Sequence, residues 1–263
     1  NRSRQEPQTV GATPNPALAD PLRHLPEPAQ LSWLTEGVTS GRTAWHLIGN
    51  QTVFTRVFRT PRADGVPGQV FNADQWDGYQ ADQSALLAAM AASGRTDPVV
   101  LTGDIHSSWS NDLPTDYAAY RRGERSSSVG VEFVCPSVTS DGFYELAGAA
   151  GPPSVAAARG ATGAVQATNP WIKYLDGVGH GWTLVDVTPE RVQADFHLTP
   201  DPTAAGTSPA TSPNCWASSS PSSSRGSSTP NGAATGPAPA NGSATTHASP
   251  TSYAPNHNVA PTP

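Results

Sequence analysis

The pattern of apolar and polar positions over residues 30–199 is that of a folded domain in which helices and strands alternate. Leu31, Leu34 and Val38 recur at helical spacing and predict a first helix. The next apolar and β-branched run, residues 45–54, predicts a strand. A helix followed by an apolar strand is typical of an α/β fold, so the pattern predicts this fold class.

Further along, the same succession recurs and then gives way to strands alone. Leu86, Leu87 and Met90 predict a second helix, and the run Val99–Leu101 before Gly103 predicts a buried strand. Three more apolar runs predict strands, and they cover residues 129–134, 183–187 and 192–198. A short polar turn joins the last two as a β-hairpin. The sequence therefore predicts a sandwich of sheets flanked by helices, in which the α/β part is followed by antiparallel strands.

The composition changes abruptly after Pro202. From Thr203 to Pro263 the chain consists mainly of Ser, Pro, Thr, Ala, Gly and Asn, and Arg225 is its only Asp, Glu, Lys or Arg residue. Such a segment cannot bury enough apolar surface to offset the entropy lost on ordering. The sequence therefore predicts a domain over residues 1–202 and a disordered tail over residues 203–263.

Charge and hydropathy argue against two classes of partner. The formal net charge is −6 at pH 7, so the chain lacks the basic surface that holds a nucleic-acid backbone, and stable nucleic-acid binding is not expected. The net charge does not argue against a small phosphorylated molecule as substrate. No run approaches the roughly 18 consecutive apolar residues of a membrane span. Nothing in the sequence indicates an oligomeric state.

The first residues of the chain indicate how it is processed. Asn1 opens the chain without the charged and apolar stretches of a signal peptide. We therefore expect a fragment or a processed product, with any export signal upstream.

Cys135 and Cys215 lie far apart in different contexts, which predicts two unpaired thiols.

The run Thr102–Trp109 contains the clearest candidate for chemistry, because a buried strand gives way at a glycine to Asp104 and His106. Loops at the carboxyl ends of strands collect ligands in open α/β sheets. On an extended chain, side chains two residues apart point to the same side, so the carboxylate and the imidazole could converge on one metal ion or on two. Carboxylates suit calcium or magnesium, and imidazoles suit iron or zinc. The alternative is that Asp104 caps a turn and His106 is a hydrogen-bonded core residue.

A second cluster, Trp76, Asp77 and Tyr79, admits two interpretations. The aromatic rings could wall a substrate pocket while Asp77 orients a ligand from behind the residues that touch it. Equally, this segment could be the start of a helix, with Asp77 as its cap and both rings in the core.

Three further residues are weaker candidates. His180 comes before a predicted strand, where its imidazole could orient a ligand or act as an acid for the leaving oxygen. Ser107 and Ser108 could donate to a phosphate oxygen, although turn capping is favoured. A rival hypothesis makes one of these serines the nucleophile of an esterase, with His106 or His180 as its base, but no GxSxG motif surrounds either serine.

Several ordered blocks together resemble one family. The run GDIHSSW, residues 103–109, is preceded by a helix and by WDGY at 76–79. It is followed by GVEFVCPSVTS at 130–140 and by LVDVTPERVQADF at 184–196. This succession is similar to the C-terminal half of PhoD-like alkaline phosphatases of the metallophosphoesterase superfamily, and the resemblance covers residues 30–196.

The resemblance implies the C-terminal part of a four-layer αββα sandwich with one ferric iron and calcium ions, which hydrolyses phosphate monoesters and also diesters outside the cytoplasm. Asp104 would ligate calcium and His106 iron. The other ligands of the family, a cysteine, an aspartate, a tyrosine and an asparagine, belong to the N-terminal half. The chain by itself is therefore expected to be inactive, and a catalytically inactive remnant is the alternative function.

Three positions invite confusion with family motifs. Cys135 follows the GDxH run, so it does not match the family's cysteine and is expected to be a buried structural thiol. Asn50 superficially resembles the GN motif of metallophosphoesterases but lies on the wrong side of the chain for a ligand. Trp171 stands after Pro170, where the family pattern suggests a histidine.

Overall fold

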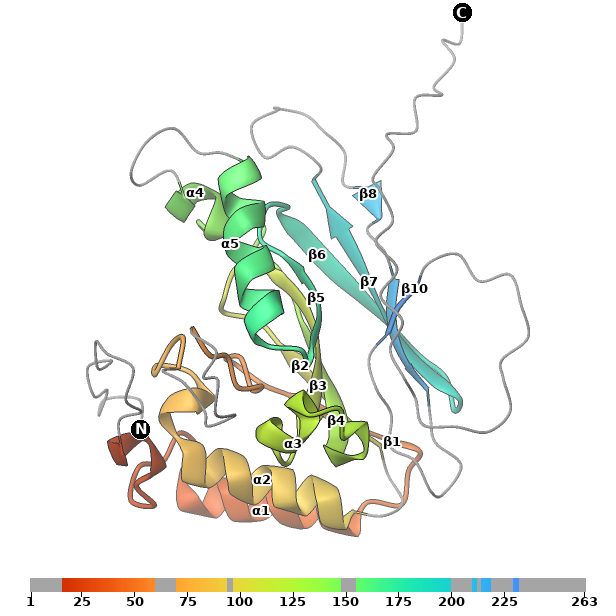
Figure 1. Ribbon diagram of the computed structural model, residues 1–263. Coiled ribbons are helices and arrows are strands. Elements are labelled where there is room, and N and C mark those ends of the chain that lie inside the picture. Colours follow the sequence, from red (N-terminus) through yellow and green to blue (C-terminus); the bar gives the residue numbers. More distant parts are fainter. Residues whose placement is uncertain are drawn as a thin grey trace, which may run out of the picture.

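A computed structural model describes residues 16–59, 70–93, 97–147 and 155–199, together with the backbone of 210–211, 214–218 and 229–231. It confirms the mixed α/β class, with helices packed on a first β-sheet and a second β-sheet beside it (Figure 1). The helices are α1 (Pro28–Ser40), α2 (Gln80–Ala92), α3 (Tyr117–Arg121), α4 (Phe143–Ala147) and α5 (Val155–Thr168). Short 3₁₀ turns lie at Pro16–Ala19 (η1), Trp76–Gly78 (η2) and Arg125–Ser127 (η3).

The first sheet has five strands in the spatial order β1-β2-β4-β3-β5. They are β1 (Trp45–Gly49), β2 (Asp97–Thr102), β4 (Ser128–Val134), β3 (Ser108–Pro114) and β5 (Ile172–Asp176). Strands β1, β2 and β4 pair in parallel, whereas β3 runs antiparallel to both β4 and β5. Consequently β1, β2, β4 and β5 all end at one edge of the sheet, where β3 begins.

The second sheet is built on the predicted hairpin of β6 (Gly181–Val187) and β7 (Arg191–Leu198). Strand β7 also pairs with β8 (Ala210–Thr211) and β9 (Asn214–Ser218), and β9 pairs with β10 (Thr229–Asn231). These pairs lie in the segment that the composition predicts to be disordered. There the backbone of β8 and β9 pairs with the edge of β7, whose hydrogen bonds need no apolar side chains. The rest of the predicted tail lies outside the described residues.

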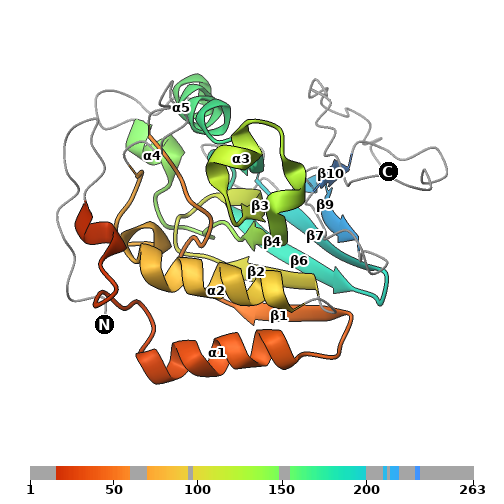
Figure 2. The same ribbon diagram turned by 60° about the horizontal axis from the view of Figure 1, so that its bottom comes forward.

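Alternating side chains place each face of the first sheet against a different layer. Val100 joins the core on the helix side, where α1 and α2 lie side by side (Figure 2). Its neighbour Val99 points the other way and packs with Phe133 of β4 and with Val192 and Phe196 of β7. The described residues therefore form a helical layer and the two sheets of the expected sandwich.

One predicted strand is shorter in the structure than in the sequence pattern. The run 45–54 leaves the sheet at Gly49 and continues as a loop. The reason is Glu132 of β4, whose carboxylate accepts hydrogen bonds from the backbone N–H groups of Phe54 and Thr55. These donors are thus satisfied by a buried side chain instead of by a neighbouring strand.

Trp171, which occupies the position where a histidine was expected, is a core residue. It is fully buried, and its ring meets Phe58 and Tyr117 edge-on at centroid distances of 5.7 and 4.7 Å. Its Nε1 donates to the carbonyl of Arg56 at 2.7 Å. It also precedes β5, so it lies at the opposite edge of the sheet from the strand ends described below.

Candidate active site

The loops that follow the strands of the first sheet bring most of the predicted site residues to one edge. Asp104, His106 and Ser107 follow β2, and His180 lies between β5 and β6. The segment after β4 joins them there, since the N–H of Cys135 donates to the carbonyl of Thr102 at 2.8 Å. Trp76, Asp77 and Tyr79 belong to a different place, the buried entry to α2 on the helix side.

The Asp104–His106 segment is bent, in contrast to the extended chain on which the sequence argument relied. Asp104 has φ 77° and His106 has φ 55°, and among the described non-glycine residues only these two have positive φ. Such conformations typically cost on the order of 1–3 kcal/mol each and persist where surrounding contacts enforce them, which is common at functional sites. The strain therefore marks the same two residues that the sequence singled out.

Hydrogen bonds define what each of these side chains can offer. The Nδ1 atom of His106 lies 2.7 Å from the carbonyl oxygen of Asp141. A carbonyl only accepts, so Nδ1 carries a hydrogen, and in the neutral imidazole Nε2 therefore keeps its lone pair. Asp104 is exposed, and neither its carboxylate nor the Nε2 of His106 has a hydrogen-bond partner among the described residues. The described contacts therefore do not support Asp104 as a turn cap or His106 as a core residue.

His180 is held on both ring nitrogens. Its Nε2 lies 3.0 Å from Oε1 of Glu145, and its Nδ1 lies 3.1 Å from Oγ of Ser137. Burial tends to raise the pKa of Glu145, but its hydrogen bonds from the Gly142 N–H and from His180 outweigh this and lower the pKa below its usual value. Because both nitrogens are engaged, the arrangement favours an orienting role for His180 over donation of a proton to a leaving group.

Ser107 and Ser108 are fully buried. The Ser107 hydroxyl donates to the carbonyl of Ile105 at 3.2 Å and accepts from Nε1 of Trp109 at 2.6 Å. These contacts stabilise the bend after β2, as the capping interpretation predicted, and leave no exposed hydroxyl for a substrate. The esterase hypothesis built on these serines is therefore not supported by their positions.

The aromatic cluster at 76–79 lies in the core. Tyr79 is buried, and Arg23 stacks over its ring at 5.0 Å. Asp77 is buried as well, and its Oδ2 accepts the N–H of Val57 at 2.9 Å, so Asp77 does not cap α2. Trp76 donates through Nε1 to Oδ1 of Asn50 at 2.9 Å. The rings thus occupy the core as the structural interpretation predicted, and Trp76 additionally reaches a pocket.

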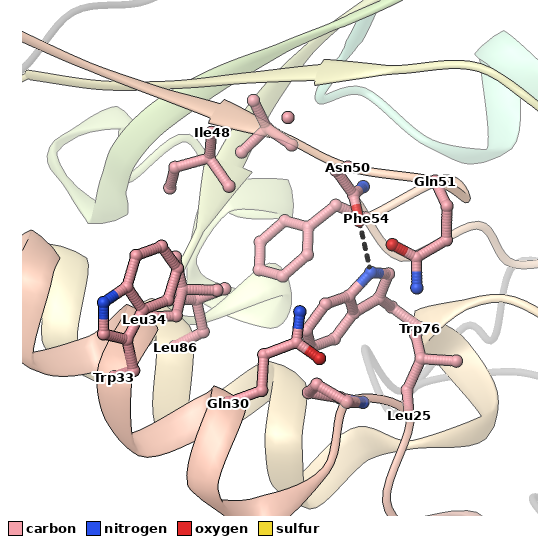
Figure 3. Close-up of a pocket in the computed structure, with 13 residues that line it drawn as sticks. Leu25, Gln30, Trp33, Leu34, Ile48, Asn50, Gln51, Phe54, Trp76 and Leu86 are labelled. Carbon is pink, nitrogen blue, oxygen red and sulfur yellow. Dashed lines mark hydrogen bonds between the residues drawn. The ribbon is translucent and has the colours of Figure 1, made fainter. Parts of the chain in front are cut away.

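This pocket lies between α1, α2 and the end of β1 (Figure 3). It has a volume of about 120 Å³. Its walls are mostly apolar, with Asn50 and two glutamines among the polar groups, and they are formed by Leu25, Pro26, Gln30, Trp33, Leu34, Ile48, Gly49, Asn50, Gln51, Phe54, Trp76, Leu86 and Val100. Asn50 is committed to protein contacts there, because its Nδ2 donates to Oγ1 of Thr102 and to the carbonyl of Thr52.

Glu132 is a buried residue that the sequence argument missed. Its carboxylate accepts the N–H groups of Phe54 and Thr55, the hydroxyl of Thr102 at 2.7 Å and the amide of Asn111 at 3.0 Å. Burial raises the pKa of Glu132, although the four hydrogen bonds oppose this. A glutamate inside the apolar run 128–134 was the available signal. Glu132 joins β4, the loop after β1 and the end of β2, directly before the Asp104 bend.

The pKa of Asp77 predicts a pH-dependent stability. Burial raises this pKa from 3.8 to about 7, against opposing effects of the Val57 N–H and Arg56. The folded state therefore binds a proton that the unfolded state has released, so stability falls as the pH rises from about 4 to about 7, by up to about 4 kcal/mol. Urea unfolding at a series of pH values should show a weaker decline for Asp77→Asn than for the parent. Parallel profiles for the two proteins would contradict this assignment.

The bend at Asp104 and His106 directly follows the parallel strand β2. The chain that contains this bend is similar to known proteins. The chain matches the model of the family described as PhoD-like phosphatase over residues 1–196. Over 196 residues it is 29% identical to alkaline phosphatase D of Bacillus subtilis (strain 168). The matched region covers 73% of this chain and 30% of that protein. A solved structure described as "Structure of PhoD" shares the fold with a TM-score of 0.63 at 24% identity, over 81% of this chain and 38% of that one. The chain thus spans about a third of the length of these relatives, and it belongs to the PhoD-like phosphatase family.

Proposed function

We propose that this chain is part of a metal-dependent phosphoesterase in which Asp104 and His106 are metal ligands. The observation that carries the proposal is the strained bend after β2, which holds an exposed carboxylate and an imidazole with a free Nε2 at the carboxyl edge of the sheet. Both donor types suit metal ions. The family to which the chain belongs supports hydrolysis of phosphate esters as the reaction.

The donor set fits part of a metal site. In the described ranges no group of three or more His, Cys, Asp or Glu side chains is placed to hold a metal ion. Following the family likeness, we propose that Asp104 binds calcium and His106 binds ferric iron, together with ligands from other parts of the full-length protein. When bound, these ions would neutralise charge on the phosphate oxygens and polarise the nucleophile.

The chain orients the imidazole of His106, whereas the positive charge at the site would come from bound ions. The formal net charge is −6, so an anionic ester gains little from the chain itself and depends on a cation at the point of reaction. The Asp141 carbonyl keeps the hydrogen of His106 on Nδ1, which leaves Nε2 as the donor atom for the ion. Phosphoryl transfer requires mainly this positioning and charge stabilisation.

The substrates follow from the family and are proposed at the level of chemical class. We propose phosphate monoesters as substrates, and diesters in addition, outside the cytoplasm. Among the described residues, no helix is long and apolar enough to span a bilayer. Cell fractionation tests the location, and recovery of the native protein with the cytosol would overturn that part of the proposal.

A serine esterase is the competing enzyme. Ser137 lies beside His180, but its hydroxyl donates to the carbonyl of Ser140 at 2.6 Å, and Glu145 engages the other ring nitrogen. The two hypotheses differ in their inhibitors. We expect a strong chelator to abolish hydrolysis of a chromogenic phosphate ester by the full-length protein, iron and calcium to restore it, and a serine-directed fluorophosphonate to leave it unchanged. Inhibition by the fluorophosphonate with no effect of the chelator would favour the esterase.

A further inference from the structure

We infer that Glu145 and His180 are positioning residues for His106. They hold the Asp141–Gly142 turn against the imidazole and so determine which ring nitrogen is free. The inference rests on the proposed function only in making His106 a metal ligand. The contacts themselves link the loops after β2, β4 and β5, none of which is adjacent to the others in sequence.

The turn touches His106 at two points. Its Asp141 carbonyl accepts from Nδ1 of the imidazole at 2.7 Å. Next to it, Gly142 packs so closely that a Cβ atom there would lie 2.5 Å from the backbone oxygen of His106. The position of the turn therefore decides both the backbone bend and the orientation of the ring.

Glu145 fixes the turn from its other side. One carboxylate oxygen, Oε2, accepts the N–H of Gly142 at 2.8 Å, and the other, Oε1, pairs with Nε2 of His180 at 3.0 Å. A carboxylate only accepts, so Nε2 of His180 carries a hydrogen. The Glu145 side chain is about one-quarter exposed and that of His180 is 15% exposed, so water screens the pair only partly.

His180 is anchored to the second sheet. Its carbonyl accepts the N–H of Thr199 at 2.8 Å, and its own N–H donates to Oγ1 of the same residue at 3.2 Å. Gly181 then donates to the carbonyl of Ser137 at 2.9 Å. The anchor is rigid at this point, because an added Cβ on Gly181 would lie 1.8 Å from the carbonyl oxygen of His197. A chain of contacts thus runs from the β6–β7 hairpin through His180 and Glu145 to His106.

Loss of these contacts has a specific chemical consequence for His106. Without Glu145, the N–H of Gly142 has lost its carboxylate partner and the turn can move away from the imidazole. His106 then has no fixed acceptor at Nδ1, and its hydrogen can move to Nε2, the nitrogen that would bind the ion. Residues that orient metal-binding histidines in this way typically contribute ten- to a hundredfold to metal affinity.

The decisive measurement is the tautomer of His106 in the metal-free full-length protein. We expect long-range ¹H–¹⁵N spectra to show the Nδ1–H form in the parent and a substantial Nε2–H population in Glu145→Ala and His180→Ala. The His106 signal is identified by its loss in His106→Gln. Glu145→Gln should stay close to the parent, because its amide oxygen can accept the Gly142 N–H, and its NH₂ can donate to Nε2 of His180 once the hydrogen of that ring lies on Nδ1, which faces Oγ of Ser137. Glu36→Ala, an exposed position on α1, is the matched control.

Metal binding supplies the second readout. With ferric iron as the probe, in competition with a chelator, Glu145→Ala should bind about ten- to a hundredfold more weakly than the parent, and Glu145→Gln should recover most of the loss. If Glu145→Ala fails to fold, Gly142→Ala replaces it, since its Cβ displaces the turn while the Glu145–His180 pair stays.

Two different failures can be told apart. An unchanged His106 tautomer in folded Glu145→Ala and Gly142→Ala would overturn the positioning role. Iron affinity that is the same in His106→Ala as in the parent would instead overturn the metal-ligand proposal, whereas the tautomer spectra of the metal-free protein would still decide the role of Glu145.

Discussion

Replacing Glu132 with alanine is expected to lower the free energy of unfolding by roughly 3–5 kcal/mol, because it leaves several buried donors without an acceptor. Phe54 and Thr55 would lose the acceptor of their backbone N–H groups, and the end of β2 would lose its contact through Thr102. Glu132→Gln should have an intermediate effect, since only one of its two terminal atoms can accept. Urea unfolding of each variant measures the difference.

The matched control is Glu124→Ala. This glutamate pairs with Arg122 on the surface, where the two side chains are 57% and 62% exposed, so its loss should change stability by less than about 0.5 kcal/mol. If Glu132→Ala were as stable as Glu124→Ala, the buried carboxylate would not be what holds the loop after β1.

Asp104→Asn and His106→Ala are expected to reduce phosphatase activity of the full-length protein more than about a hundredfold, a loss at least as large as that for residues that only orient a ligand. The amount of metal bound to each variant should fall together with its activity. The thermal midpoint of the metal-free protein should stay nearly unchanged, because neither side chain belongs to the buried core. Asparagine also tolerates the left-handed region well.

Asp186→Asn is the control for a change of charge, since Asp186 forms an exposed pair with Arg191 on the hairpin. It should retain metal and activity. Metal content equal to that of the parent in both Asp104→Asn and His106→Ala would refute these residues as ligands, whatever the activity.

The helices and strands with clear apolar periodicity could be predicted from the sequence. Helices α1 and α2, strands β2 and β4 and the β6–β7 hairpin all lie where the pattern indicated. Strand β3 was not predicted because it reads Ser-Trp-Ser-Asn-Asp-Leu-Pro, yet every one of its residues is buried. Two of its polar side chains have partners on other elements, since the amide of Asn111 donates to Glu132 of β4 and the carboxylate of Asp112 accepts from Tyr120 of α3. Such partners are not visible in a local pattern.

The sequence by itself determined the α/β class, the family and the two candidate ligands, because each depends on local periodicity or on short runs of residues. Tertiary structure alone decided which ring nitrogen of His106 is free and what role His180 can play. Those properties depend on Asp141, Glu145 and Ser137, which are brought to His106 and His180 by the order of strands in the sheet. Hydrogen bonds between loops far apart in the chain require a particular distance and direction, and only the packed strands set both.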